Sequence, residues 1–386
     1  MIKDLLIESL HGLEKIESLG NKIGSLQDPT PKIEELQRQV ADLQAKANTK
    51  QPSGARFVYV LQKDADGYSD DSWEEIIKLG QDLQYPYWLS AEETYGKKYG
   101  LGEGWSGSAA MPVIQILCEE PEYNFKGSIR LPGRFSVTST RRWASILRFH
   151  GGGKVLMDDT GYGHVPRSPV NLYVEGKTSA QTAHGPMVVK PFEQTIRNII
   201  LCAHNGGTAI YLSENQDRLR IDTVKILGHQ GSQLGIRHGP KLAEEKYPFP
   251  ATQARKFNVW LTDPVFTDLQ IEGPHNNRRP QAAIFATGAN MIFNKINLYG
   301  WMHGLLLHGG VNRNISAITQ HLGNTSDGRA FCSRDEVLSY CISYTRETVG
   351  TDSIVGVSGK FRKWYKMKHQ QAPYTCGWYE KGEGIL

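Results

Sequence analysis

The feature that most constrains the fold is a recurring unit in the second half of the chain, in which a short apolar strand, a turn or loop and another short strand follow one another. Six segments have this form. They align on Asn198, Asp222, Asp268, Asn294 and Asn314, with the sixth near Tyr340. The first five anchors lie 24, 46, 26 and 20 residues apart, and we interpret the step of 46 as two units, one with a long loop. A period in the low twenties is typical of a solenoid.

No strong helix pattern separates these strands, which favours a parallel β-helix. In such a fold each coil makes one circuit, and its inward Ile, Leu and Val side chains stack on those of the neighbouring coils. Asn or Asp at the anchor positions can bond the backbone N–H groups of a tight turn and form a column along the axis. A β-sandwich is the alternative, because its strands also recur every 8 to 12 residues or so.

The first fifty residues have a different pattern, with apolar side chains at alternating steps of three and four on either side of a break at "QDPTP". This spacing predicts two short coiled-coil segments, and a mixture of Ile and Leu at the a and d positions is compatible with three strands. A helical pair folded onto its own domain is the alternative. The predicted contact positions are Ile16, Leu19, Ile23, Leu26, Ile33, Leu36, Val40 and Leu43.

A strand, an acidic turn and an amphipathic helix are predicted from "FVYVLQKDADGYSDDSWEEIIKLGQDL", with Ser72 and Glu75 at capping-box spacing. The following segment, "YPYWLSAEETYGKKYGLGEGWSGSAAM", is rich in aromatic residues and glycine, which suggests an irregular contact surface. After it, "FKGSIRLPGRFSVTS" alternates apolar and polar residues around Pro132 and Gly133, as expected of short strands.

Two of these motifs carry a family resemblance. The run DGYSDDS, residues 66–72, with the helix after it, and the strand PGRFSV, residues 132–137, resemble the N-terminal part of pectate-lyase-like β-helix proteins, especially phage tailspikes and related polysaccharide depolymerases. The resemblance spans roughly residues 57–357. It implies a right-handed parallel β-helix whose open end is covered by the helix. It is more specific for fold than for activity, because lyases, hydrolases and binding modules share this fold.

These observations divide the chain into four parts. We predict coiled-coil attachment helices at 1–50, and a leading region with a strand, a capping helix and the aromatic insertion at 51–127. The parallel β-helix is predicted at 128–358 and a C-terminal cap or tail at 359–386. The fold class is therefore all-β, with an α-helical stalk.

The resemblance implies a homotrimeric phage tail appendage, attached to tail or baseplate proteins by its N-terminal helices and contacting bacterial surface polysaccharide through the β-helix. Its place would be the virion tail, after assembly in the host cytoplasm. One alternative is a tailspike depolymerase, a glycoside hydrolase or lyase with paired carboxylates. Another is a purely structural baseplate or tail protein. We favour an appendage without chemistry, because the chain is small and shows no carboxylate cluster.

Composition and motifs argue against several other classes. A formal net charge of +4 with dispersed Lys and Arg does not indicate a nucleic-acid partner. Five cysteines without a CxxC pair and twelve scattered histidines indicate neither a disulfide framework nor a metal site. No dinucleotide or Walker motif predicts a cofactor, and no run of about 18 apolar residues predicts membrane insertion.

Candidate catalytic residues follow from the chemistry of glycoside cleavage, which needs two carboxyl groups about 5 to 5.5 Å apart for retention or about 6.5 to 9.5 Å apart for inversion. Coils stacked at about 4.8 Å could meet this requirement with equivalent carboxylates one or two coils apart. We select Asp222 and Asp268, two coils apart in this interpretation, with Asp263 and Glu272 nearby. Turn-capping and solvated rim positions are the alternative for each. Asp217, beside Arg218 and Arg220, suggests an ion-paired loop.

Candidate glycan-binding residues are aromatic side chains, which stack on sugar rings, with nearby Arg and Asn for hydroxyl and acidic groups. The alternative for each aromatic residue is packing inside the coil or between subunits. The candidates are Trp260, Tyr299 and Trp301 on the coils, and Asn277, Arg278 and Arg279 in the loop "GPHNNRRP".

Overall fold

The computed structural model describes most of the chain from Arg56 onward. The described residues are 56–99, 104–151, 155–156, 168–203, 208–228, 234–239, 260–273, 282–301, 303–308, 312–321, 340–346, 352–358, 361–362, 366–369 and 376–379. The predicted coiled-coil positions in residues 1–50, and the loop candidates Asn277, Arg278 and Arg279, lie outside the described residues. Those predictions therefore stay predictions.

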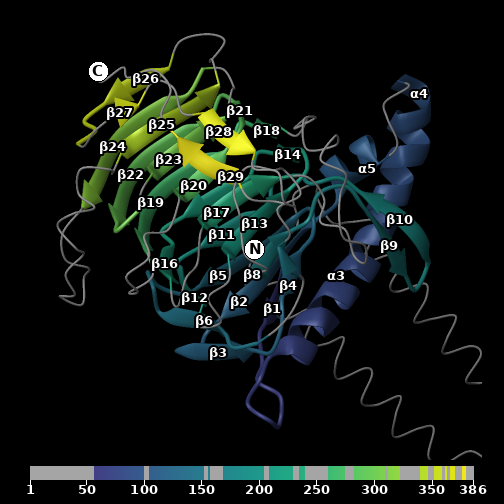
Figure 1. The fold of residues 1–386 in the computed structure, drawn as a ribbon. Coiled ribbons are helices and arrows are strands. Elements are labelled where there is room, and N and C mark those ends of the chain that lie inside the picture. Colours follow the sequence, from purple (N-terminus) through teal and green to yellow (C-terminus); the bar gives the residue numbers. More distant parts are fainter. Residues whose placement is uncertain are drawn as a thin grey trace, which may run out of the picture. The chain divides into compact units, whose positions relative to one another are not determined.

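Most described strands stack as rungs in three parallel rows, from β3 at the bottom of Figure 1 to β26 and β27 at its top. The first row consists of β1 (Arg56–Val60), β2 (Val113–Cys118), β5 (Phe135–Ser139), β11 (Thr195–Arg197), β15 (Arg220–Asp222), β19 (Val265–Glu272), β22 (Ile292–Tyr299), β24 (Asn314–His321) and β26 (Ser353–Val355). The second row contains β3 (Glu122–Phe125), β6 (Ser145–Phe149), β12 (Ile199–Ala203) and β16 (Lys225–Gly228), and continues through the second halves of β19, β22 and β24.

The third row closes each circuit. It consists of β4 (Ile129–Leu131), β8 (Ser168–Val174), β13 (Thr208–Ser213), β17 (Leu234–Gly239), β20 (Ala282–Ala286), β23 (His303–His308), β25 (Tyr340–Arg346) and β27 (Phe361–Arg362). A short fourth set lies between the third and first rows, with β14 (Gln216–Asp217), β18 (Leu261–Thr262) and β21 (Gly288–Ala289).

Neighbouring strands within these rows run parallel and come from successive coils, so the fold is a parallel β-helix. Thr195 pairs with Arg220, Arg220 with Val265, and Val265 with Ile292. A β-sandwich is excluded, because its sheets are antiparallel. Among the described strands, antiparallel pairs occur only between β7 (Val155–Leu156) and β8, between β9 (Thr178–Thr182) and β10 (Gly185–Val189), and between β28 (Lys366–His369) and β29 (Cys376–Tyr379).

The predicted coil boundaries need two corrections. Asp222 pairs directly with Thr267, so the step of 46 residues is one coil and not two. A solenoid fixes register only where strands pair, and a surface loop of almost any length can leave and return between them at little entropic cost. The first row also begins earlier than residue 128, because β1 and β2 already stack on β5.

An inward ladder of side chains forms the core of the first row. Its members are fully buried and follow one another coil by coil: Val137, Ile196, Ile221, Phe266, Phe293 and Ile315. The rings of Phe266 and Phe293 stack 4.9 Å apart and nearly parallel. Such like-on-like stacking removes apolar surface from water on both faces of every coil.

A column of left-handed residues forms the corner between the first and second rows. The column runs through Trp143, Asn198, Thr223, Asp268, Lys295 and Ala317, all with φ between 50° and 61°. Asn198 and Asp268 of the predicted column lie at this corner, whereas Asp222 and Asn294 precede it by one residue and Asn314 by three. The turn requires a left-handed backbone, not a particular side chain. Inter-coil hydrogen bonds hold it there, such as Asn198 N–H to the Asp222 carbonyl (3.2 Å).

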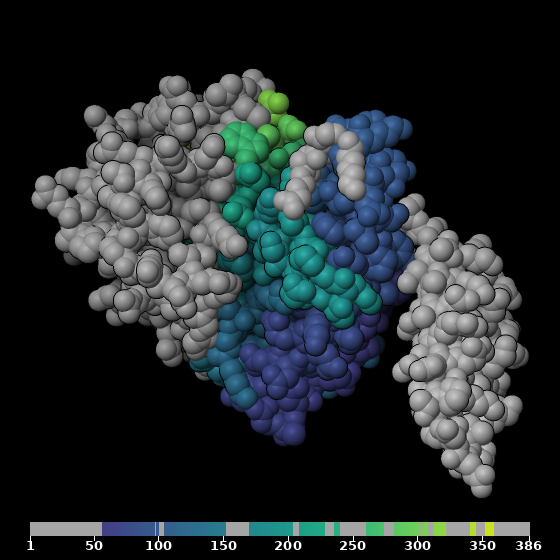
Figure 2. All heavy atoms as spheres, turned by 90° about the vertical axis from the view of Figure 1, so that its right-hand side faces the viewer, coloured from purple at the N-terminus to yellow at the C-terminus, as the bar shows by residue number. Residues whose placement is uncertain are grey.

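Helices cover the N-terminal end of the coils. Helix α3 (Asp70–Ala91) is followed by a π turn (Glu92–Gly96), α4 (Lys97–Tyr99) and α5 (Trp105–Ala110), so the expected irregular insertion is largely helical. A Cβ at Gly80 would lie only 2.7 Å from the Phe135 ring, which shows how closely α3 approaches the core. Figure 2 shows this face, where atoms of the helical segment (blue) lie beside those of the β9–β10 hairpin (teal).

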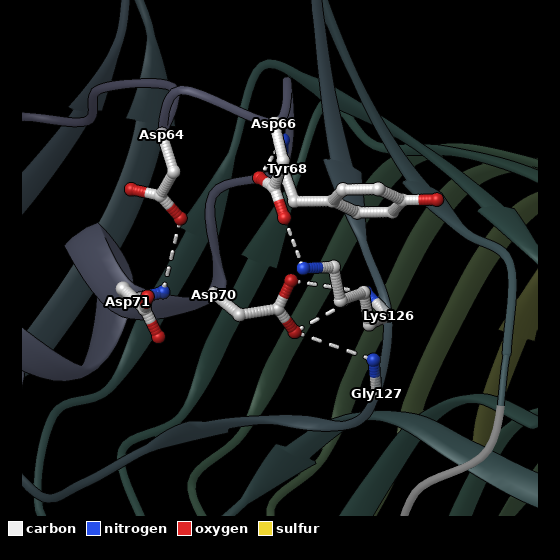
Figure 3. Close-up of polar contacts among 7 residues, drawn as sticks. All are labelled: Asp64, Asp66, Tyr68, Asp70, Asp71, Lys126 and Gly127. Carbon is white, nitrogen blue, oxygen red and sulfur yellow. Dashed lines mark hydrogen bonds and ion pairs between the residues drawn. The ribbon is translucent and has the colours of Figure 1, made fainter.

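The acidic motif acts as a clamp between the start of α3 and the loop after β3 (Figure 3). The Asp70 carboxylate accepts hydrogen bonds from the backbone N–H groups of Lys126 (3.0 Å) and Gly127 (3.3 Å), while Asp66 forms an ion pair with the Lys126 ammonium group. The helix begins at Asp70, two residues before the predicted cap. The Ser72 hydroxyl instead accepts the Gln62 N–H (3.1 Å).

Asp70→Ala should lower the free energy of unfolding by about 1–2 kcal/mol, because two backbone N–H groups lose a charged acceptor. Asp71→Ala is the matched control. Both carboxylates lie in the first turn of α3, but Asp71 is exposed and its carboxylate forms no described hydrogen bond. Urea unfolding of both variants tests this. Equal losses would show that the clamp adds nothing to the helix-dipole contribution.

Candidate functional site

A long groove lies on the outward face of the first strand row. Its volume is about 1030 Å³, and its lining comes from β1, β2, β5, β11, β15, β19 and β22 as well as from the turns beside them. Parallel strands stack at about 4.8 Å, so a groove crossing seven of them extends for roughly 30 Å along the β-helix axis. This length suits an extended polymer better than a small molecule.

The groove floor consists of outward side chains that alternate with the buried core ladder. One line of the floor runs through Gln115, Ser136, Thr195 and Arg220, which pair in register on successive coils. Amide and hydroxyl groups therefore give way to a guanidinium group along the axis. These groups can donate and accept hydrogen bonds over four successive coils, and the line then continues through the aliphatic side chains of Val265 and Ile292.

One wall of the groove consists of Glu193, Arg218, Asp263 and Asn290, which belong to a second column of left-handed corner residues with charges that alternate in sign. The column runs through Arg134, Glu193, Arg218, Asp263 and Asn290, with φ between 50° and 64°. Glu193 forms an ion pair with Arg134 and lies 3.6 Å from Arg218, while the Asn290 amide donates to Asp263 at 2.9 Å. The wall therefore neutralises much of its own charge.

The arginines of the floor and rim are less fully paired. Arg197 forms an ion pair with Asp222 (3.0 Å), and Arg56 donates to the Gln115 side-chain oxygen (3.3 Å). Arg220 is exposed and forms no ion pair with any described residue. Because four arginines line the groove against Glu193 and Asp263, the lining carries an excess of positive charge.

Asp217 lies in β14, immediately before the wall residue Arg218. Burial raises the pKa of Asp217 above its ordinary value, and the nearby carboxylates of Asp263 and Glu193 raise it further, while Arg218 opposes them. Sequence reasoning assigned Asp217 to an ion-paired loop, but the ion pair of Arg218 is made with Glu193 instead. Asp217 is therefore a carboxyl group that keeps its proton to a higher pH than an exposed aspartate.

The structure places Asp222 and Asp268 on adjacent coils, not two coils apart, because Asp222 pairs with Thr267. Asp222 bonds Arg197, and Asp268 forms ion pairs with Lys295 (2.9 Å) and Arg142 (3.1 Å).

The other two predicted acids differ in accessibility. Asp263 lies in the groove wall. Glu272 is only 3% exposed and forms an ion pair with Lys225 at 3.0 Å. Of the four predicted catalytic residues, Asp263 alone lines the groove.

The predicted glycan-stacking aromatics lie elsewhere. Trp301 is 0% exposed and its indole N–H donates to the Ile271 carbonyl at 3.1 Å, so the prediction that it stacks on a sugar is wrong. Tyr299 is half-buried in the second row, where it stacks on His321 with ring centroids 4.5 Å apart. Trp260 is 38% exposed beside β18, outside the groove lining.

Sequence reasoning missed the groove arginines Arg56, Arg197 and Arg220, and the floor residue Thr195. A signal existed, since Thr195 and Arg197 flank the inward Ile196 just as Arg220 and Asp222 flank Ile221. This pattern identifies a common groove only when the register between coils is known, and insertions of unequal length prevent the register from being read from the sequence.

Neither a metal cluster nor a membrane span is found in the part of the chain that the structure describes. No three His, Cys, Asp or Glu side chains gather there as possible metal ligands, and no described helix is long and apolar enough to cross a bilayer. Cys118, Cys202 and Cys341 are free and buried, and burial raises the pKa of the Cys118 thiol to about 12.

Several solved structures are similar to this chain. A protein of Parabacteroides merdae that carries the name of a glycosyl hydrolase matches with 7% identity and a TM-score of 0.35, over 78% of this chain and 97% of its own. The enzymatically active domain of bacteriophage CBA120 tailspike protein 2 matches with 12% identity and a TM-score of 0.30, over 64% of this chain and 37% of its own. The A-module of the Azotobacter vinelandii mannuronan C-5 epimerase AlgE4 matches with 11% identity and a TM-score of 0.22, over 79% of this chain and 96% of its own.

Sequence comparison adds no relative: no protein-family model and no curated protein matches the chain. Because the structural likenesses have TM-scores below 0.5, the assignment of a parallel β-helix rests on the strand pairing described above.

Asp217→Asn should raise stability at neutral pH. The folded state holds the Asp217 proton more tightly than the unfolded state, so ionisation destabilises the fold as pH rises through both pKa values. Asparagine mimics the protonated form, and its advantage should vanish below the ordinary Asp pKa. Thermal unfolding at pH 3 and pH 7 measures this, with Asp71→Asn as the exposed control. A destabilised Asp217→Asn protein at pH 7 would contradict the assigned environment.

Proposed function

We propose that this chain is a glycan-binding parallel β-helix protein of a phage tail appendage, and that the axial groove is its binding site. The observation that carries the proposal is a groove crossing seven strands, whose floor combines hydroxyl, amide and guanidinium groups with the aliphatic side chains of Val113, Leu117, Val265 and Ile292. Polysaccharides are extended chains of hydroxyl-bearing rings, so a line of donors and acceptors on four successive coils can contact several consecutive sugars.

The tail-appendage part of the proposal is supported by the sequence. The DGYSDDS and PGRFSV motifs resemble those of phage tailspikes, and the motif of residues 66–72 has a definite structural role at the start of α3. The apolar spacing in residues 1–50 fits a coiled coil that joins three copies to tail or baseplate proteins. The proposed partners are thus two further copies of this chain, phage tail proteins and a bacterial surface polysaccharide.

A bulky side chain on the groove floor should block binding. Thr195→Trp places an indole in the middle of the floor, and Asn297→Trp places the same indole on the outward face of the second row, outside the groove lining. Binding to a panel of purified bacterial surface polysaccharides should fall at least tenfold for Thr195→Trp and remain within about twofold for Asn297→Trp. Equal behaviour of the two variants would move the binding site away from the groove.

Asp217 favours a second candidate function, a polysaccharide depolymerase. Glu193 and Asp263 lie at equivalent positions two coils apart, which places their backbones roughly 10 Å from each other, and Asp217 lies on the coil between them. Asp217 and Asp263 therefore lie on adjacent coils, Asp263 in the groove wall and Asp217 beside it, a spacing nearer to that of a retaining pair than of an inverting pair. A carboxyl group that retains its proton suits the general acid of glycoside hydrolysis, and an ionised second carboxylate suits the nucleophile. In this scheme Asp217 protonates the leaving oxygen while Asp263 forms a glycosyl ester, which water then hydrolyses with Asp217 acting as the base.

Release of reducing ends from the bound polysaccharide tests this second function. Asp217→Asn and Asp263→Asn should each reduce release by about 100-fold or more and leave binding intact, whereas Asp71→Asn should match the parent protein. Asp222→Asn/Asp268→Asn examines the pair chosen from the sequence. Release lost only in that double variant would place the chemistry on Asp222 and Asp268, and no release by the parent protein would leave a binding protein.

A further inference from the structure

We propose that the groove selects polysaccharides that carry carboxylate groups, and that Arg56 and Arg220 are the residues that recognise this charge. The inference rests on the proposed glycan-binding function and names the class of glycan. It concerns charge, which the steric test at Thr195 does not address.

Arg56 and Arg220 differ from the other groove arginines in having no acidic partner among the residues that the structure describes. Arg197 bonds Asp222, and Arg218 lies near Glu193. Arg56 contacts only the Gln115 amide oxygen among the described residues, and Arg220 forms no described ion pair. Both guanidinium groups therefore keep N–H donors for a ligand, and a guanidinium group binds a carboxylate with two parallel hydrogen bonds.

The spacing of these groups fits a polymer rather than a free anion. Arg56 lies in β1 and Arg220 in β15, four strand spacings along the row, or roughly 19 Å along the axis. A single acidic sugar could contact one of them. A chain that bears carboxylates on repeated units can contact both, and the second contact then forms at a high effective concentration.

Two features of the groove argue against single-stranded nucleic acid, the other anionic polymer that arginines bind. The described lining contains no aromatic side chain, whereas base stacking on aromatic residues is a main source of affinity for single strands. The wall also presents Glu193 and Asp263, which would repel a backbone with a phosphate at every residue. A glycan with sparser charge can place its carboxylates at the arginines and its hydroxyl groups near the wall acids.

The experiment uses the intact chain and a panel of purified bacterial polysaccharides that contain uronic acids. Each is tested in its native form and after chemical reduction of its carboxyl groups to alcohols, and oligo-dT serves as the nucleic-acid probe. The test variant is Arg56→Gln/Arg220→Gln. The control is Lys78→Gln/Lys98→Gln, which removes the same charge from exposed positions on α3 and α4. Dissociation constants are measured at two salt concentrations.

We expect native uronic-acid polysaccharides to bind at least tenfold more tightly than their reduced forms. The Arg56→Gln/Arg220→Gln variant should lose about tenfold or more per arginine and bind both forms alike, because a hydrogen bond to a charged group contributes about a factor of ten or more. The lysine control should retain the preference. Affinity for the native form should fall as salt rises.

Two results would overturn the inference and leave glycan binding in place: equal affinity for native and reduced forms, or an unchanged preference in the arginine variant. Tighter binding of oligo-dT than of any polysaccharide would replace the glycan by a nucleic acid. Absence of binding to every native and reduced polysaccharide would overturn the inference together with the proposed function. The steric variant Thr195→Trp tests the place of binding independently of charge. It should block binding of native and reduced polysaccharides alike, because the indole fills the groove whatever the charge of the ligand.

Discussion

Hydrogen bonding between successive coils is the constraint on which the rest of the structure depends. A single coil can neither satisfy its own strand N–H and C=O groups nor bury its inward side chains, so each coil is stable only against its neighbours. Register is therefore fixed along the whole axis, as the unbroken run from Val137 to Ile315 shows. The outward side chains carry no such constraint, which leaves the first row free to form a site.

Because the register is fixed, residues that are far apart in the sequence lie next to one another on neighbouring coils. Arg134, Glu193, Arg218 and Asp263 are separated by insertions of different length, yet the left-handed corner brings them into one column in which acids and bases alternate. The same backbone geometry that ends one strand and starts the next thus builds the groove wall. A substitution at such a corner alters the turn and the wall together, because both depend on the same residue.

The sequence was sufficient to predict the fold and insufficient to predict the site, for two physical reasons. Alternation of inward Ile and Phe with outward polar residues survives any loop length, so the repeating strands and the parallel β-helix could be predicted. Alignment of outward residues on neighbouring coils requires the strand register. The long insertion between Asp222 and Asp268 made these two residues look two coils apart in the sequence, whereas they belong to adjacent coils. Trp301 failed for another reason: an indole that stacks on a sugar and one buried against Ile271 look alike in a sequence.

The electrostatics of the groove follow from this division between wall and floor. Ion pairs along the wall are partly exposed and contribute little to stability, but they cancel each other's fields and keep the corner from repelling itself. Among the described residues Arg220 forms no ion pair and Arg56 contacts only the Gln115 amide, so the excess positive charge of the lining lies on the floor and rim. Exposed charges of this kind are well hydrated and screened by salt, which favours many weak contacts over one tight contact. That balance is consistent with the groove proposed above as a polysaccharide-binding site.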